Sequence, residues 1–328
     1  MLVVLALLGY AALLGGVGGL LLTRARWAAR HPWAALRLWH ALAVGFFLSV
    51  VAALVVTAHD LWEHAVVWVF HAGKPQVHSA YAGAWHIEGV ADAAVLTLLL
   101  AAGTSGVVTA RRFAAARREQ ERARLVADAL GTADRIGGDT EVRVLEHASP
   151  TAFCVPGVGG DGGRIVVSRG AVERLTTPQL EAAVAHEQAH LRLRHHRSIL
   201  LADAVTAAVG WSGFLRGYGP QVQRLAEMAA DDHAARLHGR RPVAAALLEM
   251  CIVVPDGGAP GALAMTGPDP AERIRRLITD GAAPAGRLRR GILSGAAVLL
   301  LAAPLGISLT PAALVADTAH CGKLCARR

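Results

Sequence analysis

The sequence predicts a mainly α-helical integral membrane protein with about four transmembrane helices and one α+β domain that carries a short sheet. Hydrophobic residues make up 54% of the chain and charged residues only 18%, whereas an average soluble domain is about a quarter charged. Four apolar segments reach the length of about 20 residues that a spanning helix needs. Between the third and fourth segments, short alternating runs and helical patterns replace the apolar composition.

The four apolar segments are residues 1–22, 38–58, 91–110 and 291–315. A secretory signal is the rival interpretation of the first, but such a signal carries positive charge before its apolar run. Here the arginines follow the run, at Arg24, Arg26 and Arg30, so we expect an uncleaved span. In the fourth segment, Pro304 is expected to kink the helix or to end it early.

Arginine placement predicts the direction of the spans, because Arg-rich and Lys-rich loops stay in the cytoplasm. Residues 24–37, 111–124 and 287–290 are rich in arginine, whereas the loop 59–90 holds Lys74 and otherwise only histidines as basic residues. We expect a multi-pass cell-membrane protein with both termini outside. The predicted domains are a three-span region at 1–110, a cytoplasmic domain at 111–289, and a fourth span with a short outer tail at 290–328.

Charge and cysteine content narrow the possible partners. The chain has a net charge of +8, and its arginines cluster beside apolar runs. Membrane topology explains this clustering better than nucleic-acid binding does. We therefore expect a lipid bilayer as a partner and no direct nucleic acid. Four cysteines are too few for a disulfide scaffold, and Cys321 and Cys325 form either a bridge or two free thiols outside. The histidines of the outer loop either sense metal or pH, or lie at the interface beside tryptophans.

Short apolar runs after the third span predict three strands, at 141–145, 151–155 and 164–168. A helix is expected to begin at Thr176 or Thr177, with Pro178 in its first turn. That helix continues through "HEQAH", residues 186–190.

The HEQAH run has the spacing of a zinc site. His186 and His190 lie one helical turn apart on one face, so both rings reach one ion. Glu187 lies about 100° around the helix, near enough to act on a metal-bound water. Chance gives this pattern in roughly one chain in forty of this composition. A third ligand is therefore needed to distinguish a zinc site from a chance match.

A second run, "RLAEMAADDHAARL" at 224–237, offers that ligand. Glu227 is the candidate third ligand, and Asp231 is positioned to accept a ring N–H from a ligating histidine and fix its tautomer. The alternative is an amphipathic surface helix. A shared ion requires both runs on one side of the membrane. The apolar segment 199–215 between them is therefore expected to be a buried or membrane-abutting helix, in keeping with Asp203 in its middle.

With these motifs, the chain resembles the integral-membrane gluzincin metallopeptidases of the BlaR/MecR antibiotic-sensor type and the related HtpX/CaaX-protease type. The residues that carry the resemblance are the strand–turn–strand before HEQAH, "RLAEMAAD", and "DPAERIRRL" at 269–277, where Asp269 and Glu272 are expected to form a capping box. The resemblance implies a zincin-like domain, Zn²⁺, and a third ligand at Glu227. The span plan is closest to the sensor type, but only about a dozen residues follow the fourth span here, so we expect no extracellular penicillin-binding domain and no direct beta-lactam sensing.

Such a site hydrolyses peptide bonds, with Glu187 as the catalytic base. An extended substrate is expected to pair with the edge strand at Phe153–Val155. The candidates for stabilising the oxyanion are His233, His238 and Arg273. His195 and His196 are expected on a solvated face.

The predicted function is a membrane-bound zinc endopeptidase that cleaves a cytoplasmic or membrane protein in regulated signalling. The resemblance offers a helix-turn-helix repressor as one candidate substrate. The alternatives are a housekeeping HtpX-like protease and a zinc-domain scaffold that does not cleave.

Overall fold

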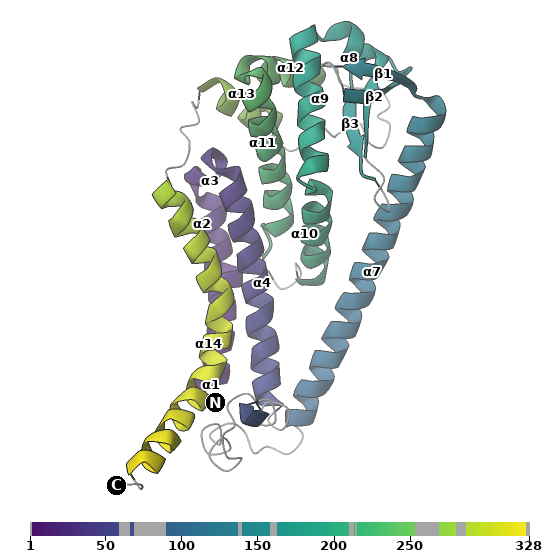
Figure 1. The fold of residues 1–328 in the computed structure, drawn as a ribbon. Coiled ribbons are helices and arrows are strands. Elements are labelled where there is room, and N and C mark those ends of the chain that lie inside the picture. The colour runs from purple at the N-terminus through teal and green to yellow at the C-terminus, as the bar shows by residue number, and fades with distance from the viewer. Residues whose placement is uncertain are drawn as a thin grey trace.

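Long helices run side by side along the molecule, and a small sheet with its covering helices sits at one end (Figure 1). The computed structural model describes residues 2–58, 66–68, 90–136, 140–157, 163–209, 213, 215–252, 269–279 and 287–325. The predicted outer loop lies almost entirely outside the described residues, as do the side chains of Cys321 and Cys325.

Four stretches of helix are long and apolar enough to cross a membrane: Leu2–Arg24, Pro32–Thr57, Asp92–Leu130 and Gly291–Pro311. The first consists of α1 (Leu2–Ala12), the π-helix η1 (Leu13–Gly18) and α2 (Gly19–Arg24). The short helix α3 (Arg26–Arg30) then leads into α4 (Pro32–Thr57).

The other two long helices continue beyond the predicted spans. Helix α7 (Val90–Leu130) joins the third apolar segment and the basic segment after it into one helix of 41 residues. It therefore passes through the predicted domain boundary at residue 110 without a break. Helix α14 (Arg287–Cys325) contains Pro304 and Pro311 in its interior. The helix continues past Pro304, which excludes an early end and leaves a kink as the expected effect of this proline.

The sheet has four strands in the order β1-β2-β4-β3. They are β1 (Thr132–Ile136), β2 (Thr140–Leu145), β3 (Ala152–Val155) and β4 (Arg164–Ser168). Strands β1 and β3 pair antiparallel with their neighbours, and β2 pairs parallel with β4. The sequence predicts β2, β3 and β4. It misses β1, because four of the five residues of "TADRI" are exposed and leave no apolar alternation to find.

Six helices complete this end of the molecule: α8 (Arg169–Arg174), α9 (Thr177–Arg192), α10 (His195–Val209), α11 (Tyr218–His238), α12 (Arg240–Ile252) and α13 (Pro270–Thr279). Thr176 is the N-cap of α9, and Gln179 Oε1 accepts a hydrogen bond from its backbone N–H at 2.8 Å. Asp269 caps α13 as expected, accepting the Glu272 N–H at 3.0 Å. The Glu272 carboxylate does not complete the expected capping box with the Asp269 backbone, because it binds Arg224 of α11 instead.

The largest apolar cluster joins the first two candidate spans to α10 and α11. It includes Leu14, Trp39, Ala202, Tyr218 and Leu225, each less than 2% exposed. Next to these residues, the backbone N–H of Leu215 donates to the carbonyl of Gly15 in η1 at 3.0 Å. The tip between α10 and α11 therefore contacts the first candidate span directly.

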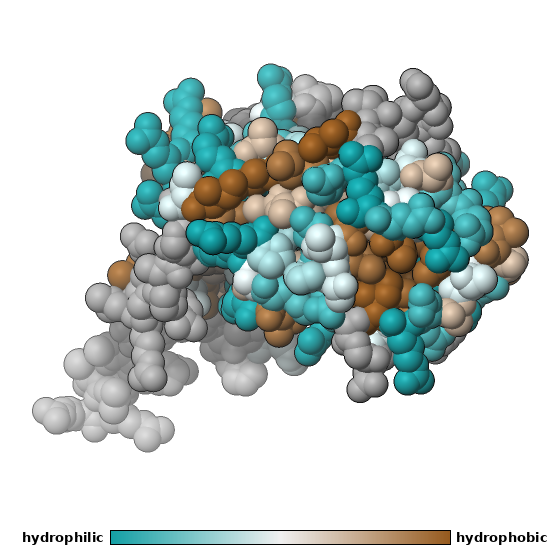
Figure 2. All heavy atoms as spheres, turned by 90° about the horizontal axis from the view of Figure 1, so that it is seen from above, coloured by the Kyte–Doolittle hydropathy of each residue, from teal (hydrophilic) through white to brown (hydrophobic). Residues whose placement is uncertain are grey.

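A second cluster packs one face of the sheet against α9 and α12, through Val142, Val167, Val184, Ala246 and Met250. This core fixes α9 relative to the strands. Seen from above, the same end of the molecule is mostly hydrophilic, with separate apolar areas between charged side chains (Figure 2). Along the candidate spans, by contrast, large apolar side chains such as Leu2, Leu21 and Leu99 are more than 60% exposed, as a lipid-facing surface requires.

Candidate metal centre

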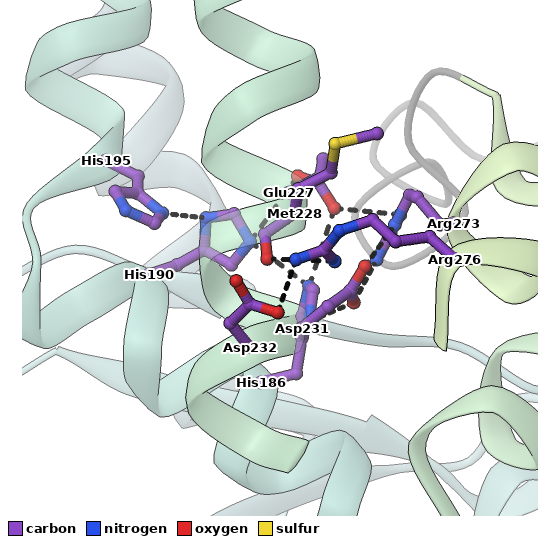
Figure 3. A network of polar contacts seen from close by, with 9 residues as sticks. All are labelled: His186, His190, His195, Glu227, Met228, Asp231, Asp232, Arg273 and Arg276. Atoms are coloured by element: carbon purple, nitrogen blue, oxygen red, sulfur yellow. Dashed lines mark hydrogen bonds and ion pairs between the residues drawn. The ribbon is translucent and has the colours of Figure 1, made fainter. Parts of the chain in front are cut away.

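Two neighbouring helices bring the three predicted ligands together. His186 and His190 project from α9, and Glu227 projects from α11 (Figure 3). One ligand atom from each residue lies within 4.8 Å of the other two. The two Nε2 atoms are 3.1 Å apart. Glu227 Oε2 is 3.4 Å from His186 Nε2, and its Oε1 is 3.4 Å from His190 Nε2.

Small side chains allow the two helices to approach so closely. Alanines at 182, 185 and 189 on α9 and at 226, 229 and 230 on α11 are all at most 3% exposed. Two of them, Ala182 and Ala185, share a buried cluster with Ala234 of α11, so small side chains line part of the contact between the two helices. The sequence therefore encodes the site through its alanines as well as through its ligands.

The donor set fits a divalent metal ion. Two imidazole nitrogens and one carboxylate oxygen are a common protein ligand set for catalytic zinc. Burial lowers the pKa of His186, but its contacts with Asp231 and Glu227 outweigh burial and raise the pKa to about 9. The buried carboxylates therefore favour positive charge at this point. Burial lowers the pKa of His190 to about 3, which keeps its ring in the neutral form that binds metals.

Asp231 lies behind His186, where the sequence analysis placed a carboxylate for a ligand ring. Its Oδ1 is 3.1 Å from His186 Nδ1, the nitrogen that faces away from Glu227. Arg273 of α13 contacts both oxygens of Asp231, with Nε 2.8 Å from Oδ2 and Nη2 2.7 Å from Oδ1. Burial raises the pKa of Asp231, but Arg273 outweighs this and holds it well below its usual range.

Glu187 lies beside the ligand triangle and is only 1% exposed. Its Oε1 atom has no hydrogen-bond partner within the described part of the chain. Burial raises the pKa of Glu187 to about 7, against the lowering effect of His186. Cys154 on the edge strand β3 is close enough for its thiol pKa to be raised by the charges of Glu187 and Glu227, in addition to the effect of burial. The edge of the sheet therefore borders the candidate base.

His195 occupies a position that the sequence analysis did not expect. The prediction of a solvated face is wrong for this residue, which is 1% exposed. Its Nδ1 is 3.2 Å from His190 Nδ1, on the side of the ring away from Glu227. The reason is the turn after α9: Arg194 has a φ of +52°, which redirects the chain and brings His195 beneath His190. No spacing rule in the sequence signals this turn.

The three candidates for oxyanion stabilisation lie in different surroundings. Arg273 is fully buried, and its Nη1 is 3.0 Å from Glu227 Oε2, so its charge is shared between Glu227 and Asp231. His233 is half-buried on α11: its Nδ1 accepts from Arg236 at 3.3 Å, and its Nε2 is buried without a hydrogen-bond partner in the described part of the chain. His238 Nδ1 is 3.7 Å from Glu181, near the other end of α9. The contacts of Arg273 favour a structural role for it, while the oxyanion assignment stays a prediction.

Helix α13 holds α11 through further ion pairs that the sequence analysis did not foresee. Arg276 binds Asp232, and Arg224 binds Glu272 through Nε at 2.7 Å. Arg276 Nε also donates to the carbonyl of Ala29 in α3 at 2.7 Å. The segment that contains the third ligand is thus tied to the connection between the first two candidate spans.

Comparison with known proteins decides the family. The sequence profile described as peptidase family M48 matches residues 114–279, which is half of the chain and includes all of these site residues. The chain belongs to peptidase family M48. A protease HtpX homolog from Listeria innocua serovar 6a is 30% identical over 125 residues, covering 38% of this chain and 41% of the relative. A protease HtpX homolog from Listeria monocytogenes serotype 4b (strain CLIP80459) is 28% identical over 168 residues, which cover 51% of this chain and 49% of the relative.

The chain therefore spans about half the length of the curated relatives that it matches. No solved structure matches it. Membership in M48 implies a metalloprotease with a metal cofactor, typically zinc, and the four apolar helices agree with a membrane-type M48 protease similar to HtpX. Both relatives are named as HtpX homologs, so they do not support the resemblance to the antibiotic-sensor type. That resemblance rests on the predicted span plan alone.

Proposed function

We propose that this chain is a membrane-bound zinc endopeptidase that hydrolyses a protein substrate on the cytoplasmic side of the membrane. One observation carries the proposal: two imidazoles and a carboxylate converge within 4.8 Å, and Glu187, on the same helix, is buried beside them. His186, His190 and Glu227 would hold the ion. The relatives named as proteases favour cleavage over a scaffold that binds zinc without cutting.

The chain's own residues supply the remaining chemistry. A zinc ion held by His186, His190 and Glu227 would polarise a carbonyl group and lower the pKa of a bound water. Glu187 accepts the proton of the attacking water and delivers it to the leaving amine. Asp231, held by Arg273, keeps the His186 ring in place.

Strand β3 is proposed to bind the substrate. It forms one edge of the described sheet, and its residue Cys154 neighbours Glu187. A substrate segment in extended conformation adds to such an edge through backbone hydrogen bonds. A peptide bond aligned there lies beside the base, which favours unfolded or loop segments as substrates.

The decisive experiment compares full-length wild-type protein with Glu187→Gln in cells, by mass spectrometry of new protein N-termini. We expect cleavage products that disappear in Glu187→Gln and in His190→Ala, while purified Glu187→Gln retains one zinc ion. Glu173→Gln, an exposed change just before α9, is the matched control and should cleave normally. Identical products from wild type and Glu187→Gln would contradict the proposal and favour the scaffold alternative.

The same data address the biological role. Products from a helix-turn-helix repressor would support regulated signalling, whereas products from many membrane proteins would support housekeeping cleavage. Both roles use the same active site.

A further inference from the structure

The two candidate metal-binding histidines have different partners behind their rings. His186 faces the carboxylate of Asp231, as described above. His190 faces His195, whose Nδ1 lies 3.2 Å from the Nδ1 of His190. The two rings meet edge to face, with centroids 4.9 Å apart and an interplanar angle of 87°. His195 is only 1% exposed and contacts the ring of a candidate ligand, so it can affect how that ring is oriented.

The direction of this hydrogen bond follows from the ligand geometry. His190 presents its Nε2 to Glu227 and to His186 Nε2, so a metal ion would bind that nitrogen. A neutral imidazole bound through Nε2 carries its proton on Nδ1. His190 must then donate, and His195 must accept through its own Nδ1, with its proton on Nε2. Only this pair of tautomers satisfies the 3.2 Å contact.

We propose that His195 is a positioning residue for His190: it accepts the Nδ1–H of His190 and so fixes the tautomer and the ring orientation in which Nε2 faces the ion. This inference rests on the metallopeptidase function proposed above. Groups that hold ligand rings in this way commonly change metal affinity by about 10- to 100-fold when removed.

The surroundings of His195 hold its ring in place. The left-handed residue Arg194 turns the chain between α9 and α10, so that the His195 ring at the start of α10 meets the His190 ring. Trp33 of α4 packs against the His195 ring, with centroids 5.6 Å apart. A candidate membrane span therefore contacts one metal ligand through a single intervening side chain.

A neutral acceptor at this point has a chemical consequence. A carboxylate behind a ligating histidine raises the basicity of the ring and strengthens its bond to the metal. His190, backed by an imidazole, should be the weaker of the two histidine ligands. Replacing His195 by aspartate should then tighten metal binding, provided that the acceptor reaches Nδ1.

The test measures zinc affinity of the full-length protein in detergent, by competition with a chromophoric chelator. His195→Leu should weaken zinc binding about 10- to 100-fold. His195→Asn, which places an amide oxygen where Nδ1 stands, should recover most of the loss, and His195→Asp should equal or exceed wild type. His196→Leu, a change in the adjacent histidine, should bind normally. The absorption bands of bound Co²⁺ should shift in His195→Leu and return in His195→Asn.

Normal zinc affinity and an unchanged Co²⁺ spectrum in His195→Leu would overturn the inference. So would equal losses in His195→Leu and His195→Asn, because the residue would then act by packing alone. If His195→Leu does not fold, as judged by circular dichroism, the Asn and Asp variants decide: both must bind zinc within about tenfold of wild type for the inference to stand. If wild type binds no zinc, or His186→Ala binds it equally well, the proposed function itself fails.

Discussion

The two halves of helix α11 are held mainly by different forces, although Arg224 near the end of the first half also pairs with Glu272 of α13. Its first half, from Tyr218 to Leu225, packs in the apolar cluster with the first two candidate spans, and Tyr218, Val222 and Leu225 are at most 1% exposed. Its second half carries Glu227 and the two aspartates that pair with Arg273 and Arg276 of α13. One helix therefore connects a lipid-side core to a buried network of charges.

The difference shows how the metal ligand is fixed. Apolar packing sets where α11 lies relative to the membrane, but it is non-directional. Ion pairs with fixed geometry set how the helix is rotated toward α9. Changes to the apolar packing of the first half should therefore lower stability alone. Changes to the ion pairs of the second half should lower both stability and metal affinity.

Removing the membrane partner of the first half should have the largest effect. A fragment of residues 111–289 leaves the apolar face of α11 without Leu14, Trp39 and their neighbours. We expect this fragment to aggregate or to unfold without cooperativity, as measured by size-exclusion chromatography and thermal circular dichroism. A soluble monomer with a cooperative transition and bound zinc would show that the apolar half is dispensable.

Arg273→Met should have the next largest effect, on the charged half. The change leaves Asp231 and Glu227 buried without their cation, which typically costs about 3–5 kcal/mol of unfolding free energy. Zinc affinity should fall as well, because Asp231 no longer holds a fixed position behind His186. Denaturant unfolding in detergent measures the first quantity and chelator competition the second. Arg275→Met, an exposed change on the same helix, should leave both unchanged.

Leu225→Ala tests the apolar half by itself. This side chain is 0% exposed in the cluster with the candidate spans, and such a truncation costs about 2–5 kcal/mol. In the protein that remains folded, zinc affinity should stay within about twofold of wild type, since no ion pair is altered. Leu237→Ala, at a position 58% exposed on the same helix, is the control and should change stability little. A large loss of zinc affinity in Leu225→Ala would mean that the halves are not separable.

Tyr218→Phe should have the smallest effect. It removes one hydrogen bond within the apolar half, between the Tyr218 hydroxyl and His40 Nδ1 at 2.6 Å. A hydrogen bond of this kind contributes about 1 kcal/mol, so a small fall in melting temperature and normal proteolysis are expected. A loss of unfolding free energy above about 2 kcal/mol would mean that this contact stabilises the protein by more than a single hydrogen bond does.

The parts of the site that local spacing determines could be predicted from the sequence. His186 and His190 share a helix face by their separation alone, and Asp231 follows Glu227 by one turn for the same reason. The structure brings all four together as expected, across two separate helices. The cap at Thr176 was predictable because its chemistry is confined to a few residues.

The parts that depend on chain direction could not be predicted. His195 reaches His190 only because Arg194 turns the backbone, and a positive φ at arginine leaves no compositional mark. Strand β1 forms because its backbone pairs with β2, although its side chains are exposed. Arg273 is one of three candidates for stabilising the oxyanion, but its partners in the structure lie on α11, and sequence spacing says nothing about which helix an α13 side chain will face.

The hydrogen bond from Leu215 to the carbonyl of Gly15 joins residues that leave the ribosome 200 positions apart. If the first candidate span inserts during synthesis, it enters the lipid long before the tip between α10 and α11 exists. Docking of that tip should therefore be a late step of biogenesis, templated by a helix already inserted. Helix α11 begins at Tyr218, directly after the tip. Glu227 on this helix should therefore reach its final position only after the first candidate span has inserted. A nascent or mis-inserted copy would then lack a complete candidate metal site.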